Sequence, residues 1–133
     1  TKGCSVKLLL GAQTASQLYP GHLLPHGVEL FTATDDGTAG ERGRVTGLIP
    51  GHIGRADQVF ACGPLPMYRD MAQKQKELGL KGKSVQISLE VVMGCGHGVC
   101  YGCTIRTKKG LKQVCTDGPV FDLDDIIWDR LES

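Results

Sequence analysis

The segment Gln58-Val59-Phe60-Ala61-Cys62-Gly63-Pro64 decides the fold that the sequence predicts. A short apolar run that ends in Gly-Pro is typical of a strand that leaves a sheet through a turn. After it, Pro66 in the first turn and Gly79 at the end delimit a helix predicted over about residues 65–78. A second strand is predicted over residues 85–89. Strand, helix and strand in this order indicate a parallel βαβ unit.

The same alternation extends toward the N-terminus. Apolar runs predict strands over residues 6–10 and 28–32, and short helices are expected over residues 14–19 and 45–49. We therefore predict an α/β fold, a parallel sheet with flanking helices, over the first two thirds of the chain. Ligands of such sheets gather at the carboxyl ends of the strands, where the loops after Leu10, Thr32 and Cys62 begin.

Four cysteines follow the last of these strands with the spacing C-x4-C-x2-C-x11-C: Cys95, Cys100, Cys103 and Cys115. Plant-type [2Fe–2S] proteins open with C-x4-C-x2-C before a more distant fourth cysteine. Glycines between the cysteines allow several backbone N–H groups to turn toward sulfur; they are Gly94, Gly96, Gly98 and Gly102. The spacing predicts a [2Fe–2S] cluster held by the four cysteines, and hence a role in electron transfer.

Three other interpretations of the cysteines compete with this one. A structural zinc site also takes four cysteines, but it usually pairs two C-x2-C knuckles, and only Cys100 and Cys103 form one here. A disulfide framework is less favoured, because a chain of 133 residues needs no staples and nothing marks it for export. His97 completes half of a Rieske pattern, but no second Cys-x-x-His follows.

The remaining C-terminal residues predict a hairpin and a helix. Strands over residues 104–107 and 112–115, joined by a turn at Lys108-Lys109-Gly110, return the fourth cysteine to the others. Asp117-Gly118-Pro119 ends the hairpin, and a helix is predicted over residues 122–131.

Composition excludes several classes of function. A net charge of +1 gives no electrostatic footprint for nucleic acid. The longest apolar runs have about five residues, so we expect no membrane span, and the absence of an N-terminal signal segment predicts a cytoplasmic location. No Ser/His/Asp or paired-carboxylate arrangement indicates hydrolysis, and no catalytic residue is predicted.

Several segments together carry a resemblance to a known family. They are Cys62-Gly63-Pro64-Leu65-Pro66-Met67, Val85-Gln86-Ile87-Ser88-Leu89-Glu90, Met93 to Cys103, and Val114 to Phe121. In this order they resemble the C-terminal part of the electron-transfer subunits of class 1B dihydroorotate dehydrogenases. Small subunits of sulfide dehydrogenases and soluble hydrogenases share the plan.

The resemblance implies a ferredoxin–NADP reductase-like protein. Residues 1–90 would be an incomplete NAD-binding domain and residues 91–133 a [2Fe–2S] lobe. Electrons would pass between NAD(H), FAD and the cluster to a flavin-containing catalytic subunit, most simply dihydroorotate dehydrogenase of pyrimidine biosynthesis. The implied nucleotide contacts lie after three strands: Gly11 and Thr14, Asp35, and Cys62, Gly63 and Pro64.

The chain departs from the family in one large way, since the flavin-binding barrel and the first glycine-rich strand–helix unit are missing. No G-x-G-x-x-G occurs. We therefore expect a piece of a longer protein that holds a cluster but not FAD, with neither tight NAD binding nor turnover on its own. NADH and NADPH stay undecided, with Ser16 and Arg42 or Arg44 as the candidates beside the ribose. A zinc-stabilised interaction module is the alternative from another class.

Overall fold

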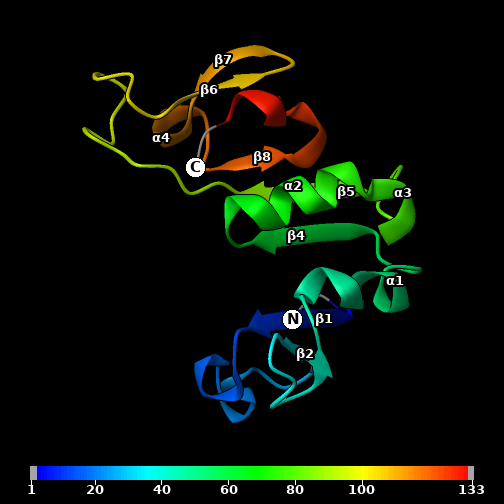
Figure 1. Cartoon of the computed structure of the whole chain (residues 1–133). Helices are drawn as coiled ribbons and strands as arrows, with labels where there is room; N and C mark the ends of the chain where they lie inside the picture. Colours follow the sequence, from blue (N-terminus) through cyan, green and yellow to red (C-terminus); the bar gives the residue numbers. More distant parts are fainter. Residues whose placement is uncertain (1–2, 132–133) are drawn as a thin grey trace. The chain divides into compact units, whose positions relative to one another are not determined.

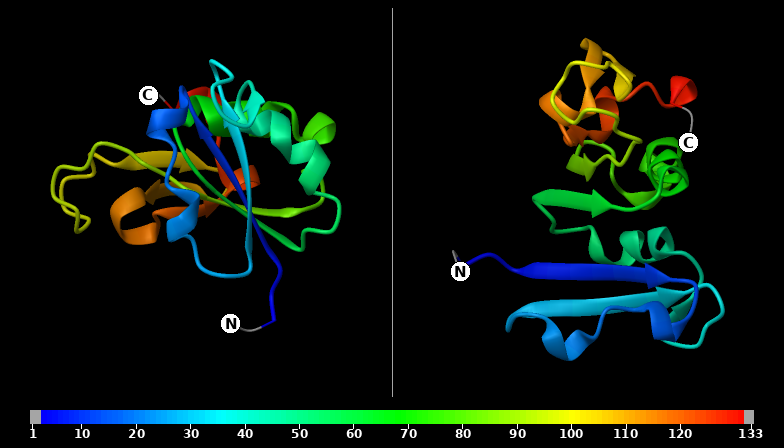
Figure 2. Two further views of the ribbon diagram at one scale, coloured as in Figure 1. Left: turned by 90° about the horizontal axis from the view of Figure 1, so that it is seen from below. Right: turned by 90° about the vertical axis from the view of Figure 1, so that its left-hand side faces the viewer.

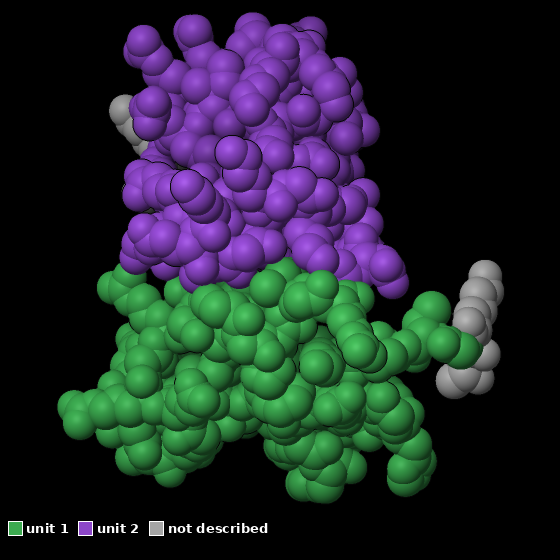
Figure 3. Space-filling view, turned by 90° about the vertical axis from the view of Figure 1, so that its right-hand side faces the viewer, with its two compact units in different colours: residues 1–55 green, residues 56–133 purple. Residues whose placement is uncertain are grey.

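The computed structural model describes residues 3–131. The outer ends of the two predicted domains, residues 1–2 and 132–133, lie outside this range. The chain divides into two compact units, unit 1 from Thr1 to Arg55 and unit 2 from Ala56 to Ser133 (Figure 3). This division by compactness differs from the predicted boundary at residue 90, which separates a nucleotide-binding part from a cluster-binding lobe by function. The functional boundary stays a prediction.

Unit 1 is built on a parallel sheet with the order β1-β2-β3. Its strands are β1 (Val6–Ala12), β2 (Val28–Thr34) and β3 (Glu41–Arg42). The two strands predicted here are confirmed, and each extends two residues beyond its predicted end. Val6 pairs with Val28 and Ala12 with Thr34, so both strands deliver their following loops to the same edge of the sheet.

The helices of unit 1 are short. The helix predicted over residues 14–19 is only a 3₁₀ turn, η1 (Ala15–Gln17), followed by a second one, η2 (Gly21–Leu23). Pro20 explains this, because the residue before a proline is driven out of the helical region. The helix predicted over residues 45–49 is confirmed as η3 (Val45–Leu48), which continues into α1 (Ile49–His52).

Unit 2 contains the predicted βαβ unit (Figure 1). β4 (Gln58–Cys62) and β5 (Ser84–Ser88) are parallel, and β8 (Val120–Asp122) lies antiparallel on the other side of β5. The predicted helix is divided at Lys74 into α2 (Leu65–Gln73) and α3 (Gln75–Leu78), and it ends at Gly79, whose φ is +75°. The buried core of this unit includes Tyr68, Met71, Leu80, Ile87, Leu89 and Leu123.

The hairpin is confirmed as β6 (Thr104–Thr107) and β7 (Gly110–Gln113), but it does not reach the fourth cysteine. Cys115 lies in a one-turn helix, α4 (Val114–Asp117). The Asp117 side chain accepts a hydrogen bond from the Gln113 N–H at 2.7 Å, which favours a turn over a continued strand.

The prediction of a helix over residues 122–131 is wrong. The segment forms two 3₁₀ turns, η4 (Leu123–Asp125) and η5 (Trp128–Arg130), with extended backbone between them. Its backbone groups bond to the hairpin instead: Lys108 N–H donates to the Asp125 carbonyl at 2.7 Å, and Ile127 N–H donates to the Arg106 carbonyl at 3.1 Å. Tertiary hydrogen bonds have overridden the local pattern.

α2 has 9 residues, and no helix within residues 3–131 is both long enough and apolar enough to cross a membrane.

Candidate functional site

The cysteine loop, residues 89–103, begins after the end of β5 and ends at the start of β6. It projects from the sheet as the yellow-green segment of Figure 1, and the left-hand view of Figure 2 shows the same excursion. Gly96 and Gly98 have φ values of +72° and +85°, a region that residues with a Cβ seldom enter. These two glycines let the chain curl around the first cysteine.

Three backbone N–H groups point at the sulfur of Cys95. His97, Val99 and Cys100 donate to Cys95 Sγ at 3.5, 3.3 and 3.4 Å. Because donors stabilise the thiolate, the N–H groups of His97, Cys100 and Val99 lower the pKa of Cys95 from its ordinary 9.0 to about 6. The loop is therefore shaped to hold a negative charge on this sulfur.

The other three sulfurs differ in their surroundings. Gly102 N–H donates to Cys100 Sγ at 3.4 Å. The backbone of Cys115 lowers the pKa of Cys103, whereas the Cys103 side chain raises the pKa of Cys115. Gln113 Nε2 donates to the Gly98 carbonyl at 3.2 Å, so the first part of the loop contacts the segment that carries the fourth cysteine.

The four thiols are arranged as two pairs. The sulfurs of Cys103 and Cys115 are 3.4 Å apart. Cys95 and Cys100 are joined by the bond from Cys100 N–H to Cys95 Sγ at 3.4 Å, and the Cys100 side chain also lowers the pKa of Cys95. Within residues 3–131 no three His, Cys, Asp or Glu side chains form a group placed to share one metal ion. Two thiol pairs, each with backbone N–H donors, fit a two-iron cluster, which takes two thiolates per iron and accepts hydrogen bonds on sulfur.

His97 does not point at the sulfurs through its ring. Its Nδ1 lies 2.7 Å from the carbonyl oxygen of Cys95, so the ring bonds to the loop backbone. The His97 backbone N–H donates to the Cys95 sulfur. This arrangement gives no support to a Rieske-type ligand role for His97.

Of the predicted nucleotide residues of unit 1, Thr14 and Asp35 lie in two loops that meet beyond β1 and β2. Asp35 N–H donates to the Ala12 carbonyl at 3.1 Å, and Thr14 Oγ1 lies 3.1 Å from Thr38 Oγ1. Thr38 also accepts from Ala15 N–H at 2.8 Å. The structure thus brings Thr14 close to the loop that contains Asp35.

Two residues that the sequence did not single out organise this loop, Asp36 and Thr38. Both the N–H and the hydroxyl of Thr38 donate to Asp36 Oδ1, at 3.0 and 2.6 Å, and the Thr38 and Thr14 side chains lower the pKa of Asp36. The Asp35 side chain is exposed. The Asp36-Gly37-Thr38 sequence is itself a turn signal that could have identified the pair.

Gly11 has a packing role in this structure. It lies inside β1, and a Cβ placed on it would come 2.7 Å from Cβ of Val45. The position therefore requires glycine for the close approach of η3 to the strand, whatever ligand the loop beyond it receives.

Cys62, Gly63 and Pro64 lie at the carboxyl end of β4 and open α2, as predicted. The Cys62 side chain is exposed. Gly63 N–H donates to the hydroxyl of Tyr68 at 2.8 Å, and that hydroxyl donates to the Ser88 carbonyl at 2.6 Å. Cys62 and Ser88 are paired in register, so the Cys62–Pro64 turn and the root of the cysteine loop lie side by side.

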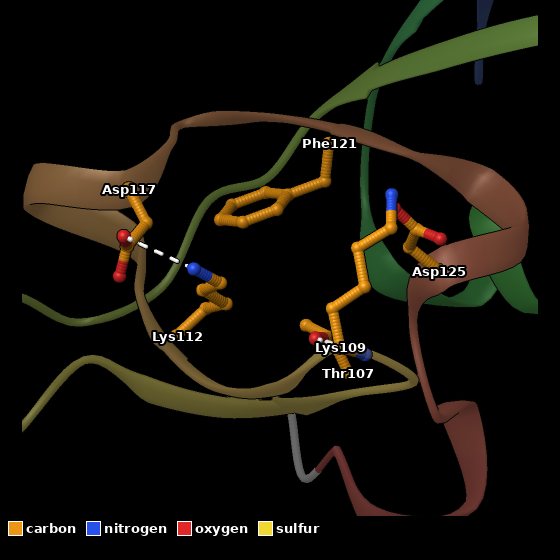
Figure 4. Close-up of a pocket in the computed structure, with 6 residues that line it drawn as sticks. All are labelled: Thr107, Lys109, Lys112, Asp117, Phe121 and Asp125. Atoms are coloured by element: carbon orange, nitrogen blue, oxygen red, sulfur yellow. Dashed lines mark hydrogen bonds and ion pairs between the residues drawn. The ribbon is translucent and has the colours of Figure 1, made fainter.

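A small pocket lies beside the hairpin, with a volume of about 130 Å³. Figure 4 shows the Phe121 ring pointing into it between two lysine–aspartate pairs. Lys109 Nζ lies 2.5 Å from Asp125 and Lys112 Nζ lies 3.6 Å from Asp117. Both lysines are engaged by carboxylates, so the pocket presents no net charge to a ligand.

A comparison with solved structures places the chain in a class. It aligns with an NADH-dependent reduced ferredoxin–NADP oxidoreductase studied for flavin-based electron bifurcation, with a TM-score of 0.81 and 28% identity, over 96% of this chain and 46% of that chain. The fold is that of a ferredoxin–NADP reductase-like electron-transfer protein, as predicted.

Sequence comparisons add a family match over part of the chain. Residues 90–127 match the family described as the iron-sulfur cluster binding domain of dihydroorotate dehydrogenase B. The chain is 38% identical over 130 residues to the electron transfer subunit of dihydroorotate dehydrogenase B (NAD(+)) from Bacillus caldolyticus, covering 95% of this chain and 48% of that subunit. The same subunit from Bacillus cereus (strain B4264) is 35% identical over 131 residues, covering 95% and 49%. The chain spans about half the length of the curated relatives it matches.

Proposed function

We propose that this chain is the cluster-carrying part of an NAD(H)-linked electron-transfer subunit. One observation carries the proposal: the four cysteine sulfurs lie as two pairs on which backbone N–H groups converge. Cys95 and Cys100 would hold one iron, and Cys103 and Cys115 the other. A [2Fe–2S] cluster bound there supplies reversible one-electron transfer.

The chain's own residues determine how such a group is held. The N–H groups that donate to Cys95 and Cys100 stabilise negative charge on sulfur, which would raise the potential of a bound cluster relative to a loop without donors. Cys103 is buried and Cys100 is exposed, so one side of the site faces solvent. A cluster held there would exchange electrons by outer-sphere transfer, for which this chain's residues would supply binding and shielding rather than an acid or a base.

The partner follows from the relatives. Electron transfer subunits of dihydroorotate dehydrogenase B are similar to this chain over nearly its whole length, which favours a flavin-containing dihydroorotate dehydrogenase as the catalytic subunit, in the cytoplasmic synthesis of pyrimidines. The likeness to the ferredoxin–NADP oxidoreductase favours a second candidate, the same role in another flavin-containing oxidoreductase such as a sulfide dehydrogenase or soluble hydrogenase.

The nucleotide contacts are proposed in two groups. Cys62, Gly63 and Pro64 would face the nicotinamide ring, because they lie at the carboxyl end of a parallel strand with the thiol exposed. Thr14 and Asp35 lie in loops that meet at the equivalent edge of unit 1 and would contact the remainder of the dinucleotide, while Gly11 would shape the first of these loops from within β1. FAD would be bound by parts of the full-length protein outside this chain.

Spectroscopy of the purified chain tests the proposal. Visible absorption and EPR are recorded before and after dithionite, with iron and zinc quantified on the same sample. About two irons per chain and a rhombic signal on reduction are expected. One zinc per chain without visible bands would overturn the proposal in favour of a zinc-stabilised interaction module.

A matched pair of variants shows which thiols are ligands. Cys100→Ser should abolish the cluster signal. Cys62→Ser should leave it unchanged, because Cys62 lies on β4 and outside both thiol pairs.

A further inference from the structure

The hydroxyl of Tyr68 lies where two parallel strands separate. Cys62 and Ser88 form the last paired positions of β4 and β5. Beyond them, Gly63 turns into α2, and Leu89 N–H bonds to the Pro119 carbonyl at 2.9 Å. The Tyr68 oxygen accepts from Gly63 N–H at 2.8 Å and donates to the Ser88 carbonyl at 2.6 Å.

This hydroxyl replaces one rung of the ladder. In a continued parallel pair, backbone N–H and C=O groups of the two strands would bond directly. Here one oxygen atom stands between the Gly63 N–H and the Ser88 C=O, so the strands move apart while both backbone groups remain satisfied. The separation occurs at the carboxyl edge, where ligands of parallel sheets bind.

The tyrosine is held firmly in place. Its side chain is 0% exposed, and the ring of Trp128 packs against it with 6.0 Å between ring centroids. Trp128 is fixed in turn by a bond from its Nε1 to the Leu123 carbonyl at 3.1 Å. Burial also raises the pKa of Tyr68, so the hydroxyl keeps its proton and remains a donor to Ser88 at neutral pH.

We infer that Tyr68 is a positioning residue whose hydroxyl holds the Cys62–Pro64 turn in the conformation that receives a nicotinamide nucleotide. Through Ser88 the same hydroxyl fixes the root of the loop that carries the cysteines. The inference rests on the proposed function and adds to it a buried residue that touches neither the nucleotide nor the cluster.

Steady-state kinetics of Tyr68→Phe test the inference in the full-length subunit loaded with FAD and cluster, with NADH as donor and ferricyanide as acceptor. The phenyl ring keeps the packing, but the Gly63 N–H and the Ser88 carbonyl lose their partner. The KM for NADH is expected to rise about tenfold. Because no group at the reacting atoms has changed, kcat should stay within about twofold. Tyr19→Phe, an exposed tyrosine of unit 1, is the matched control and should change neither value.

Amide hydrogen exchange gives a second test that needs no variant. In the wild-type protein the Gly63 N–H should exchange as slowly as the amides of β5, although it lies beyond the end of β4. In Tyr68→Phe it should exchange at least about tenfold faster.

Two results would overturn the inference. One is an unchanged KM in a folded Tyr68→Phe protein, and the other is free exchange of Gly63 in the wild type. Failure of the proposed function would be seen separately, as zinc in place of iron in the wild-type chain.

Discussion

Two glycine-rich loops of this protein use the hydrogen-bonding groups of their backbone in opposite ways. In the loop at residues 34–43, side chains serve the backbone: the Thr34 hydroxyl both donates to the Ala39 carbonyl and accepts from its N–H, and Thr38 accepts from Ala15 N–H. In the loop at residues 94–103, the backbone donates to side chains, because its N–H groups point at cysteine sulfurs.

The difference separates a self-supporting loop from a ligand-dependent one. Hydroxyl and carboxylate oxygens are good acceptors in the protein alone, so the first loop needs no ligand to keep its shape. A neutral thiol is a weak acceptor, and its bonds strengthen only when the sulfur carries negative charge. The second loop is therefore stabilised most when its sulfurs are thiolates, the state in which they bind metal.

The largest effect expected from this comparison is the loss of the cluster in Cys103→Ser. The variant removes a buried sulfur that is paired with Cys115 at 3.4 Å. The reduced EPR signal and the visible bands should disappear, while the far-UV circular dichroism of both units remains. A brown, EPR-active Cys103→Ser protein would contradict the pairing of the thiols.

Gly40→Ala should give the largest loss in the self-supporting loop. Gly40 has a φ of +61°, and a Cβ there would overlap the backbone carbonyl of Thr32, which cannot move aside like a side chain. We expect the free energy of unfolding, measured in urea, to fall by about 2–4 kcal/mol. Gly47→Ala is the control, since nothing lies within 4 Å of its position. A loss no larger than that of the control would show that the loop rearranges easily.

Alkylation of the reduced, cluster-free protein tests whether the backbone donors of the cysteine loop act on Cys95 without metal. Because the pKa of Cys95 is lowered to about 6 and that of Cys115 is raised, Cys95 is mostly thiolate at pH 7 and Cys115 is not. Iodoacetamide should modify Cys95 about tenfold faster, the lower nucleophilicity of an acidic thiol offsetting part of the gain. The rate at Cys95 should fall as the pH drops below 6.

Equal rates at the two cysteines, measured by peptide mass spectrometry, would mean that the backbone donors leave Cys95 when no metal is bound.

The smallest effect concerns acid and the Asp36–Thr38 pair. Hydrogen bonds from Thr38 and Thr14 lower the pKa of Asp36 below 3.8, so their contribution to stability is present above that pH and is lost as the pH falls through the folded value. Thr38→Val should return the Asp36 pKa toward 3.8, as followed by carboxyl-carbon NMR. If Asp36 titrates at the same pH in the wild type and in Thr38→Val, the Thr38 hydroxyl does not lower the pKa of Asp36.

Much of the fold could be predicted because it rests on local patterns. β4 and β5 are short runs rich in β-branched and apolar residues, and Pro66 and Gly79 mark the limits of the helical segment between them. The predicted helix at residues 122–131 failed because its backbone bonds to Arg106 and Lys108, contacts that no local pattern reports.

The candidate site divides in the same way. The cysteine spacing is a sequence feature, so Cys95 and its three partners could be named before the structure. Asp36 and Thr38 carry a local turn signal, but their contact with Thr14 needs the loops after β1 and β2 side by side. Tyr68 could not be named, because its role needs the ends of β4 and β5 side by side. Hydroxyl bridges of this kind leave no periodic signal in a sequence.

The position of β8 has a consequence for how such a protein can be altered. Val120 pairs with Ser88, and Leu89 bonds to Pro119, so the chain returns to within one strand of where it departed. Everything from residue 90 to residue 118 is therefore an excursion with adjacent ends, like a domain inserted into a tight turn. An excursion of this form can change in length with little added closure entropy. Grafting it onto another pair of neighbouring strands would also require partners for Arg106 and Lys108, whose backbone groups bond to Ile127 and Asp125 beyond β8.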